Sequence, residues 1–140
     1  MTGSTPKSAL EKVGGLMFLP RTLSKIRLHA TGELRADFHA HMGIRGDGWC
    51  CDFLHVKYAD LKARVLAGDT DEQIFEWCQQ NGRPLNDTDL LVWNAYVSKL
   101  GWNDFATPNL ARNKNENGLA HRDDIITMLD FWEVDEGRKP

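Results

Sequence analysis

Apolar residues that recur every three or four positions are the feature that most constrains the fold of this 140-residue chain. The apolar positions step by four, three and four between Leu54 and Val65, and by three, four and three between Leu90 and Leu100. Such spacing places the apolar side chains on one face of an α-helix. The pattern therefore predicts an all-α or mostly helical protein.

Residues that start and stop helices set the limits of about five predicted helices. Pro20 and Gly32 enclose the first, and Thr70 with Gln73 has the spacing of a capping box at the start of the third. We predict helices over 20–31, 52–67, 70–81, 86–100 and 125–132, packed as an irregular orthogonal array. The glycine-rich and asparagine-rich segments 33–50 and 103–120 are predicted as loops, with room for a small two-stranded element in 34–50.

The length and the 41% hydrophobic content fit one compact domain. Residues 1–12 are small and polar, which predicts a mobile N-terminal arm. We expect residues 13–140 to form a single globular helical domain.

The sequence shows neither a secretory signal nor a membrane span. Val13 to Leu19 is apolar but contains two glycines and is followed by Pro20 and Arg21, whereas a spanning helix needs about 20 apolar residues. The three cysteines are an odd number and a poor disulfide framework. We expect a cytoplasmic protein with no membrane partner.

Charge is distributed unevenly along the chain. The net charge of −3 argues against nucleic acid as a partner. Residues 1–35 carry six Lys and Arg against two Glu, and residues 69–104 carry two Lys and Arg against seven Asp and Glu. Two interpretations are open: the basic and acidic segments attract one another within the fold, or the basic end steers an anionic ligand.

A set of residues distributed over nearly the whole chain resembles a bacterial family known as the domain of unknown function numbered 5069. The residues that carry the resemblance are Gly14, Gly15, Leu19, Pro20, Arg21, Lys25, Arg27, Gly32, Asp71, Trp77, Asp135, Glu136, Gly137 and Arg138. The resemblance implies a small, mostly helical, cytoplasmic bacterial protein, and it implies no function. Members often carry a Tyr shortly after the glycine that corresponds to Gly32, where this chain has Phe38.

The first predicted helix carries a stripe of possible anion ligands. Arg21, Lys25 and His29 are four residues apart and share one face. A guanidinium grips carboxylate or phosphate with two donors, and Lys25 adds a charge one turn away. We therefore predict an anion site at Arg21 and Lys25. The alternatives are a solvated face, or an ion pair from Arg21 that fixes the C-terminus.

The acidic residues near the C-terminus are the alternative partners of that first helix. Asp135 and Glu136 follow the last predicted helix, where the helix dipole disfavours acid, so we expect a partner such as Arg21 or Arg27. Both carboxylates are also candidates for acid–base catalysis.

Three histidines lie close together in sequence. His39, His41 and His55 are candidate acid–base residues and weaker candidate metal ligands. Adjacent Cys50 and Cys51 do not have the separation of a zinc-binding pair, so surface histidines without metal are the expected state. Motifs for nucleotide cofactors, zinc proteases and serine hydrolases are absent from the sequence, and we predict no cofactor.

The five tryptophans fall into two groups. Trp77, Trp93 and Trp132 lie on apolar helix faces and are predicted to be core residues. Trp49 and Trp102 follow glycines at loop ends, where a large ring covers the core or forms the wall of a pocket. Phe38 and Trp49 are the predicted aromatic walls of the anion site.

Three functions are compatible with these features. The first is a small-molecule-binding protein that holds an anionic metabolite with Arg21 and Lys25; whether it is an enzyme is undecided. The second is a non-enzymatic interaction module whose basic first helix and acidic helix 70–81 contact a partner protein or a second copy. The third is a metal-dependent enzyme that uses His39, His41 and His55.

Overall fold

The computed structural model describes residues 2–140 and contains two compact units, Met1–Leu91 (unit 1) and Val92–Pro140 (unit 2). The predicted single domain over 13–140 stays a prediction.

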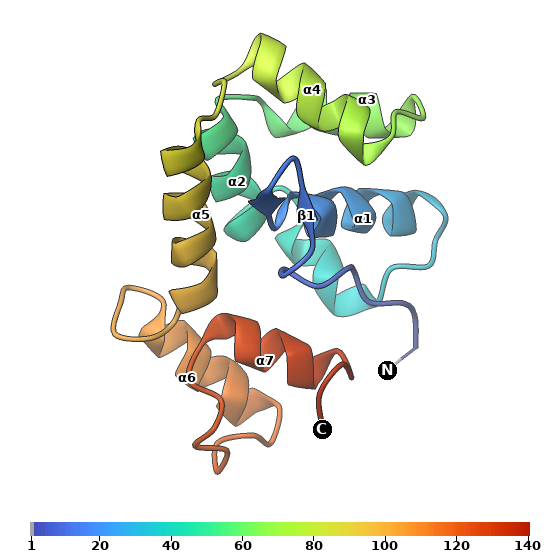
Figure 1. Ribbon diagram of the computed structural model, residues 1–140. Helices are drawn as coiled ribbons and strands as arrows, with labels where there is room; N and C mark the ends of the chain where they lie inside the picture. The colour runs from blue at the N-terminus through green and yellow to red at the C-terminus, as the bar shows by residue number, and fades with distance from the viewer. Residues whose placement is uncertain (1) are drawn as a thin grey trace. The chain divides into compact units, whose positions relative to one another are not determined.

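The protein is mostly helical, as predicted. Residues 2–140 contain eight helices, one of them a 3-10 helix, and one two-stranded antiparallel sheet, so the number of helices exceeds the predicted five (Figure 1). Unit 1 contains β1 (Lys12–Val13), β2 (Leu16–Met17), α1 (Leu19–Ala30), η1 (Ala36–His41), α2 (Gly46–Leu54), α3 (Tyr58–Leu66) and α4 (Asp71–Asn81). Helix α5 (Asp87–Lys99) spans the boundary, and unit 2 continues with α6 (Thr107–Glu116) and α7 (Met128–Asp135).

The helix predicted over 52–67 is wrong, because the chain breaks there. Helix α2 ends at Leu54, and His55 adopts a left-handed conformation with φ +56°. The N–H of Val56 returns to the carbonyl of Cys51, and α3 begins at Tyr58. A left-handed histidine is uncommon, and the sequence gives no sign of it. The apolar spacing continues across the break and therefore does not reveal it.

The prediction of a loop with a small two-stranded element in 34–50 is also wrong. That segment contains η1 and the first turn of α2, and Leu34 forms only an isolated bridge to Ser4. The two-stranded sheet lies at 12–17, where Gly14 and Gly15 both have positive φ. A side chain at Gly14 would overlap the Phe75 ring of α4, so this hairpin requires glycine on two grounds.

The predicted loop 103–120 contains α6, a helix of ten residues. Pro108 lies in its first turn and Leu110 is buried. The asparagine-rich composition hid this helix, since asparagine has a low helix propensity. Packing of α6 against α7 overrides that preference (Figure 1).

Residues 4–12, predicted as part of a mobile arm, pack against the rest of unit 1. Ala9 is fully buried, and the Lys7 N–H donates to the Ser24 hydroxyl at 2.9 Å. Ser4 exchanges backbone hydrogen bonds with Glu33 and Arg35. The mobility of residues 4–12 stays a prediction. The small, polar composition of this segment did not indicate these contacts.

Helix α1 lies at the centre of unit 1 and contacts α2, α3 and β1. Leu19, Leu23 and Ile26 of α1 are at most 1% exposed, and Leu61 of α3 and Ile74 of α4 are fully buried. This core fixes α3 and α4 side by side (Figure 1). Within residues 2–140, no helix has both the length and the apolarity to cross a membrane.

Candidate functional site

A groove along α3 and α4 is an open recess on unit 1. One part of it, about 630 Å³, is lined by three carboxylates, three amides, a guanidinium and an indole: Asp69, Glu72, Glu76, Gln73, Gln80, Asn81, Arg64 and Trp77. A second part of about 380 Å³ shares Arg64, Asp69 and Trp77 and adds Asp60, Ala63 and Ala67. The groove therefore combines an aromatic wall with an excess of negative charge.

Local sequence explains why these side chains line the surface. Thr70 accepts from the N–H of Gln73 and the Gln73 side chain accepts from the N–H of Thr70, which is the predicted capping box. Ile74 and Cys78 anchor the inner face of α4. The helical period then directs Glu72 and Glu76 outward.

The centre of the groove is Arg64, which we group with Asp69 and Trp77 as the groove triad. An Arg64 guanidinium nitrogen lies 2.7 Å from the Asp69 carboxylate, and its central carbon lies 5.5 Å from the centre of the Trp77 ring. The Arg64 Nε and the Asp69 Oδ2 have no aligned hydrogen-bond partner among residues 2–140. The pair is thus in Coulombic contact without good hydrogen-bond geometry.

Sequence reasoning missed this groove. It assigned Trp77 to the core, whereas the ring is partly exposed and forms the groove wall. The residue follows the buried Ile74 by three positions, which places it at the edge of the apolar face. That edge position was the sequence signal that the Trp77 ring could be partly exposed. Nothing in the sequence indicated that Arg64 would reach it.

The basic first helix and the acidic fourth helix attract one another, as one interpretation of the charge distribution proposed. Arg27 of α1 donates to the Asp71 carboxylate at 2.5 Å and to the Asp69 carbonyl at 3.1 Å. Lys7 lies 3.8 Å from Asp71. Arg27 thereby pairs within unit 1.

Lys25, a predicted anion ligand, is in a buried ion pair. Its ammonium lies 3.2 Å from the Asp47 carboxylate, which is fully buried and also accepts from the Thr22 hydroxyl at 2.8 Å and the Gly43 N–H at 3.2 Å. The ammonium also lies 5.8 Å from the centre of the Phe18 ring. We call Phe18, Lys25 and Asp47 the buried triad. Its lysine charge is compensated inside the fold.

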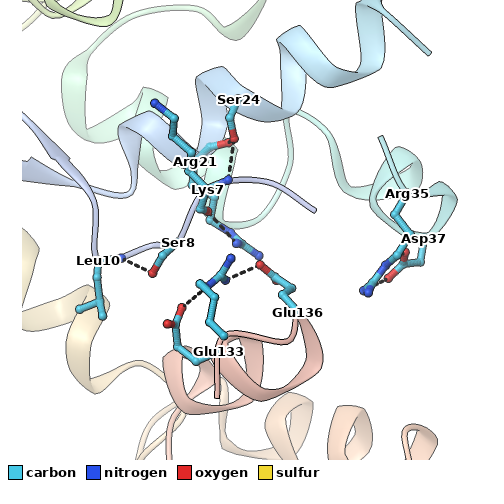
Figure 2. Close-up of polar contacts among 10 residues, drawn as sticks. Lys7, Ser8, Leu10, Arg21, Ser24, Arg35, Asp37, Glu133 and Glu136 are labelled. Atoms are coloured by element: carbon cyan, nitrogen blue, oxygen red, sulfur yellow. Dashed lines mark hydrogen bonds and ion pairs between the residues drawn. The ribbon is translucent and has the colours of Figure 1, made fainter. Parts of the chain in front are cut away.

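Arg21, the other predicted anion ligand, is 1% exposed. It donates to the Lys7 carbonyl at 3.1 Å, beside the Ser24 hydroxyl that holds the Lys7 N–H (Figure 2). Its guanidinium carbon lies 5.7 Å from the centre of the Phe38 ring. The structure therefore brings Arg21 and Phe38 together in a buried position.

The remaining predicted aromatic wall, Trp49, lies in α2 and is partly buried. Phe38 also contacts Arg35, whose guanidinium carbon is 4.9 Å from the ring centre and whose side chain pairs with Asp37 (Figure 2). The role of Trp49 and Phe38 toward a ligand stays a prediction.

Two of the histidine candidates, His39 and His41, lie in η1, and the third, His55, lies at the end of α2. His39 contacts the Leu34 carbonyl at 3.0 Å and the His29 ring edge-on at 4.9 Å, whereas His55 is the left-handed residue that ends α2. Burial, followed by the charges of Arg45 and Lys25, lowers the pKa of His41. No three His, Cys, Asp or Glu side chains gather as metal ligands within residues 2–140.

The three cysteines are free and buried. Burial raises the pKa of Cys51 to about 12 and that of Cys78 to about 11, and it also raises the pKa of Cys50 well above its usual value. Since the thiolate is the reactive form, this environment disfavours a nucleophilic role.

The acidic candidates near the C-terminus belong to unit 2. Glu136 accepts from Arg138 at 2.5 Å, and the same arginine donates to Glu133 at 2.8 Å. Asp135 lies at the end of α7 and is partly buried. Arg27, one of the two suggested partners, pairs with Asp71 instead. An ion pair from Arg21 would join the two units and stays a prediction.

Comparison with known proteins agrees with the resemblance found in the sequence. No curated protein matches the chain. The sequence model described as Domain of unknown function (DUF5069) matches residues 3–138. Because this match covers nearly the whole length, the chain belongs to the DUF5069 family.

Proposed function

We propose that the chain is a non-enzymatic interaction module whose α3–α4 groove binds a cationic segment of a partner protein. The observation that carries the proposal is the groove itself, in which the carboxylates of Asp69, Glu72 and Glu76 surround the Trp77 ring. Carboxylates attract cations over long range, and an indole face binds them at short range.

The negative charge of the groove is available to a partner. Arg27 and Lys7 neutralise Asp71, at the start of α4. Glu72 and Glu76 form no ion pair within the described residues 2–140, and both are exposed. The acidic helix therefore retains two uncompensated charges that face solvent.

The anionic-metabolite function ranks second. It requires Arg21 and Lys25 to meet a ligand, yet both are buried and Lys25 is paired with Asp47. An incoming anion would have to displace a carboxylate that holds three hydrogen bonds. We propose a cytoplasmic location on the ground that three free, buried thiols suit a reducing compartment.

The test uses a fluorescein-labelled octalysine peptide and fluorescence anisotropy at low salt. Binding should weaken as salt is raised, because exposed ion pairs are screened. The double variant Glu72→Gln/Glu76→Gln should bind several-fold more weakly, with an upper limit of about 30-fold set by two exposed pairs of about 1 kcal/mol each.

A matched control removes the same charge elsewhere. Asp52→Asn/Asp123→Asn changes two exposed carboxylates outside the groove. If both double variants weaken binding equally, net charge rather than the groove is responsible and the proposed site is wrong. An absence of binding to the wild type contradicts the proposed function.

A further inference from the structure

We infer that Asp69 and Trp77 form a guanidinium site, which Arg64 of the chain itself occupies in the absence of a partner and which an arginine side chain of the partner takes over on binding. This inference rests on the proposed function, and it adds the chemical class of the ligand and a built-in competitor for it.

The contacts of Arg64 are those that would recognise an arginine ligand. Its guanidinium lies over the Trp77 ring, with 5.5 Å between its carbon and the ring centre, and reaches Asp69 at 2.7 Å. A planar guanidinium can stack on an indole and meet a carboxylate with two parallel donors, whereas an ammonium can do neither. The site therefore favours arginine over lysine.

Arg64 occupies this position loosely. Its side chain is 42% exposed and that of Asp69 is 23% exposed. The Asp69 Oδ2 and the Arg64 Nε lack an aligned hydrogen-bond partner among residues 2–140, although the two groups are close enough for one. A ligand guanidinium that approaches along the groove could align both of its donors with the carboxylate. Displacing an exposed pair of this kind should cost at most about fivefold in affinity.

The groove has room beside Arg64 for the exchange. The recess of about 630 Å³ and the recess of about 380 Å³ share the three residues of the groove triad. Glu72 and Glu76 line the first recess, and Asp60 lines the second. A basic segment bound in the groove can thus meet carboxylates in both recesses.

The experiment compares labelled octa-arginine and octalysine peptides on three single variants. Arg64→Ala removes the competitor, and Lys57→Ala removes the same charge from an exposed position outside the groove. Arg64→Ala should tighten octa-arginine binding up to about fivefold, more than it tightens octalysine binding and more than Lys57→Ala does. Asp69→Asn should abolish the preference for octa-arginine.

The outcomes separate the two proposals. If the peptides bind and the Glu72→Gln/Glu76→Gln variant weakens them, but Arg64→Ala has the same effect as Lys57→Ala on both peptides, the interaction module stands and the guanidinium site is wrong. Weaker octa-arginine binding by Arg64→Ala also overturns the inference. If neither peptide binds the wild type, both proposals fail.

Discussion

The buried triad and the groove triad have the same chemical composition, a cation, a carboxylate and an aromatic ring, and nearly the same dimensions. The ion-pair distances are 3.2 and 2.7 Å, and the cations lie 5.8 and 5.5 Å from the ring centres. The two triads differ in burial: the Lys25 and Asp47 side chains are 8% and 0% exposed, whereas those of Arg64 and Asp69 are 42% and 23% exposed.

The carboxylate of the buried triad also accepts more hydrogen bonds than the carboxylate of the groove triad. Asp47 accepts from Thr22 and Gly43 as well as Lys25, which compensates the cost of removing its charge from water. The Asp69 Oδ2, by contrast, has no aligned hydrogen-bond partner among residues 2–140. The same three kinds of group therefore link α1 to α2 in one place, and in the other they form the site that we propose to be exchangeable.

The largest expected effect comes from removing each carboxylate in turn. Asp47→Ala should lower the free energy of unfolding by about 3–5 kcal/mol, because it leaves the Lys25 charge buried without its carboxylate. Asp69→Ala should cost at most about 1 kcal/mol, since its pair is partly exposed. Urea unfolding measures both values. Equal losses would break the distinction between the two triads.

A smaller effect is expected at the turn that carries the Gly43 N–H to Asp47. Gly43 has φ +77°, and a Cβ there would lie 2.7 Å from the Tyr58 ring. Gly68→Ala is the control, because Gly68 also has positive φ but open space around it. Gly43→Ala should cost about 1–3 kcal/mol more than Gly68→Ala by urea unfolding, which is the cost of overpacking. Similar losses would show that the turn tolerates the added methyl group and that its fit against Tyr58 does not support the buried triad.

The smallest expected effect is a pH dependence near the buried triad. The pKa of His41 is lowered below 6.5 by burial first and then by Arg45 and Lys25, so the unfolded chain takes up the proton at a higher pH than the folded chain. The contribution of neutral His41 to the free energy of unfolding is fully present above pH 6.5. It is lost as the pH falls from 6.5 through the pKa of His41 in the folded chain.

Thermal or urea unfolding between about pH 5 and pH 8 measures this decline. His41→Gln should make the profile flatter than that of the wild type, and His121→Gln, at an exposed histidine of unit 2, is the matched replacement. A profile of His41→Gln as steep as that of the wild type would exclude His41 as its source.

Helices with local signals could be predicted from the sequence. The predictions over 20–31, 70–81 and 86–100 match α1, α4 and α5 closely. The signals that predict these helices, which are the apolar spacing, a proline, a capping box and a glycine, each act within a few residues. The break at His55 and the helix in 107–116 could not be predicted, since each depends on packing that overrides the preference of the residues involved.

The candidate site was harder to predict than the fold. Helical spacing correctly placed Arg21 and Lys25 on one helix, but whether a helix face meets solvent or protein depends on distant segments. Trp77 was assigned to the core for the same reason: periodicity identifies the apolar side of a helix and not the position at which its neighbours end.

The sequence by itself determined that the chain is mostly helical and where three of its helices lie, and it left open whether its basic beginning and acidic middle attract one another. Only the tertiary structure decided which charges are buried and which are open to a ligand. The physical reason is that desolvation depends on every segment packed around a charge: Asp47 compensates Lys25 from 22 residues away, whereas the side chains of Arg64 and Asp69 remain 42% and 23% exposed.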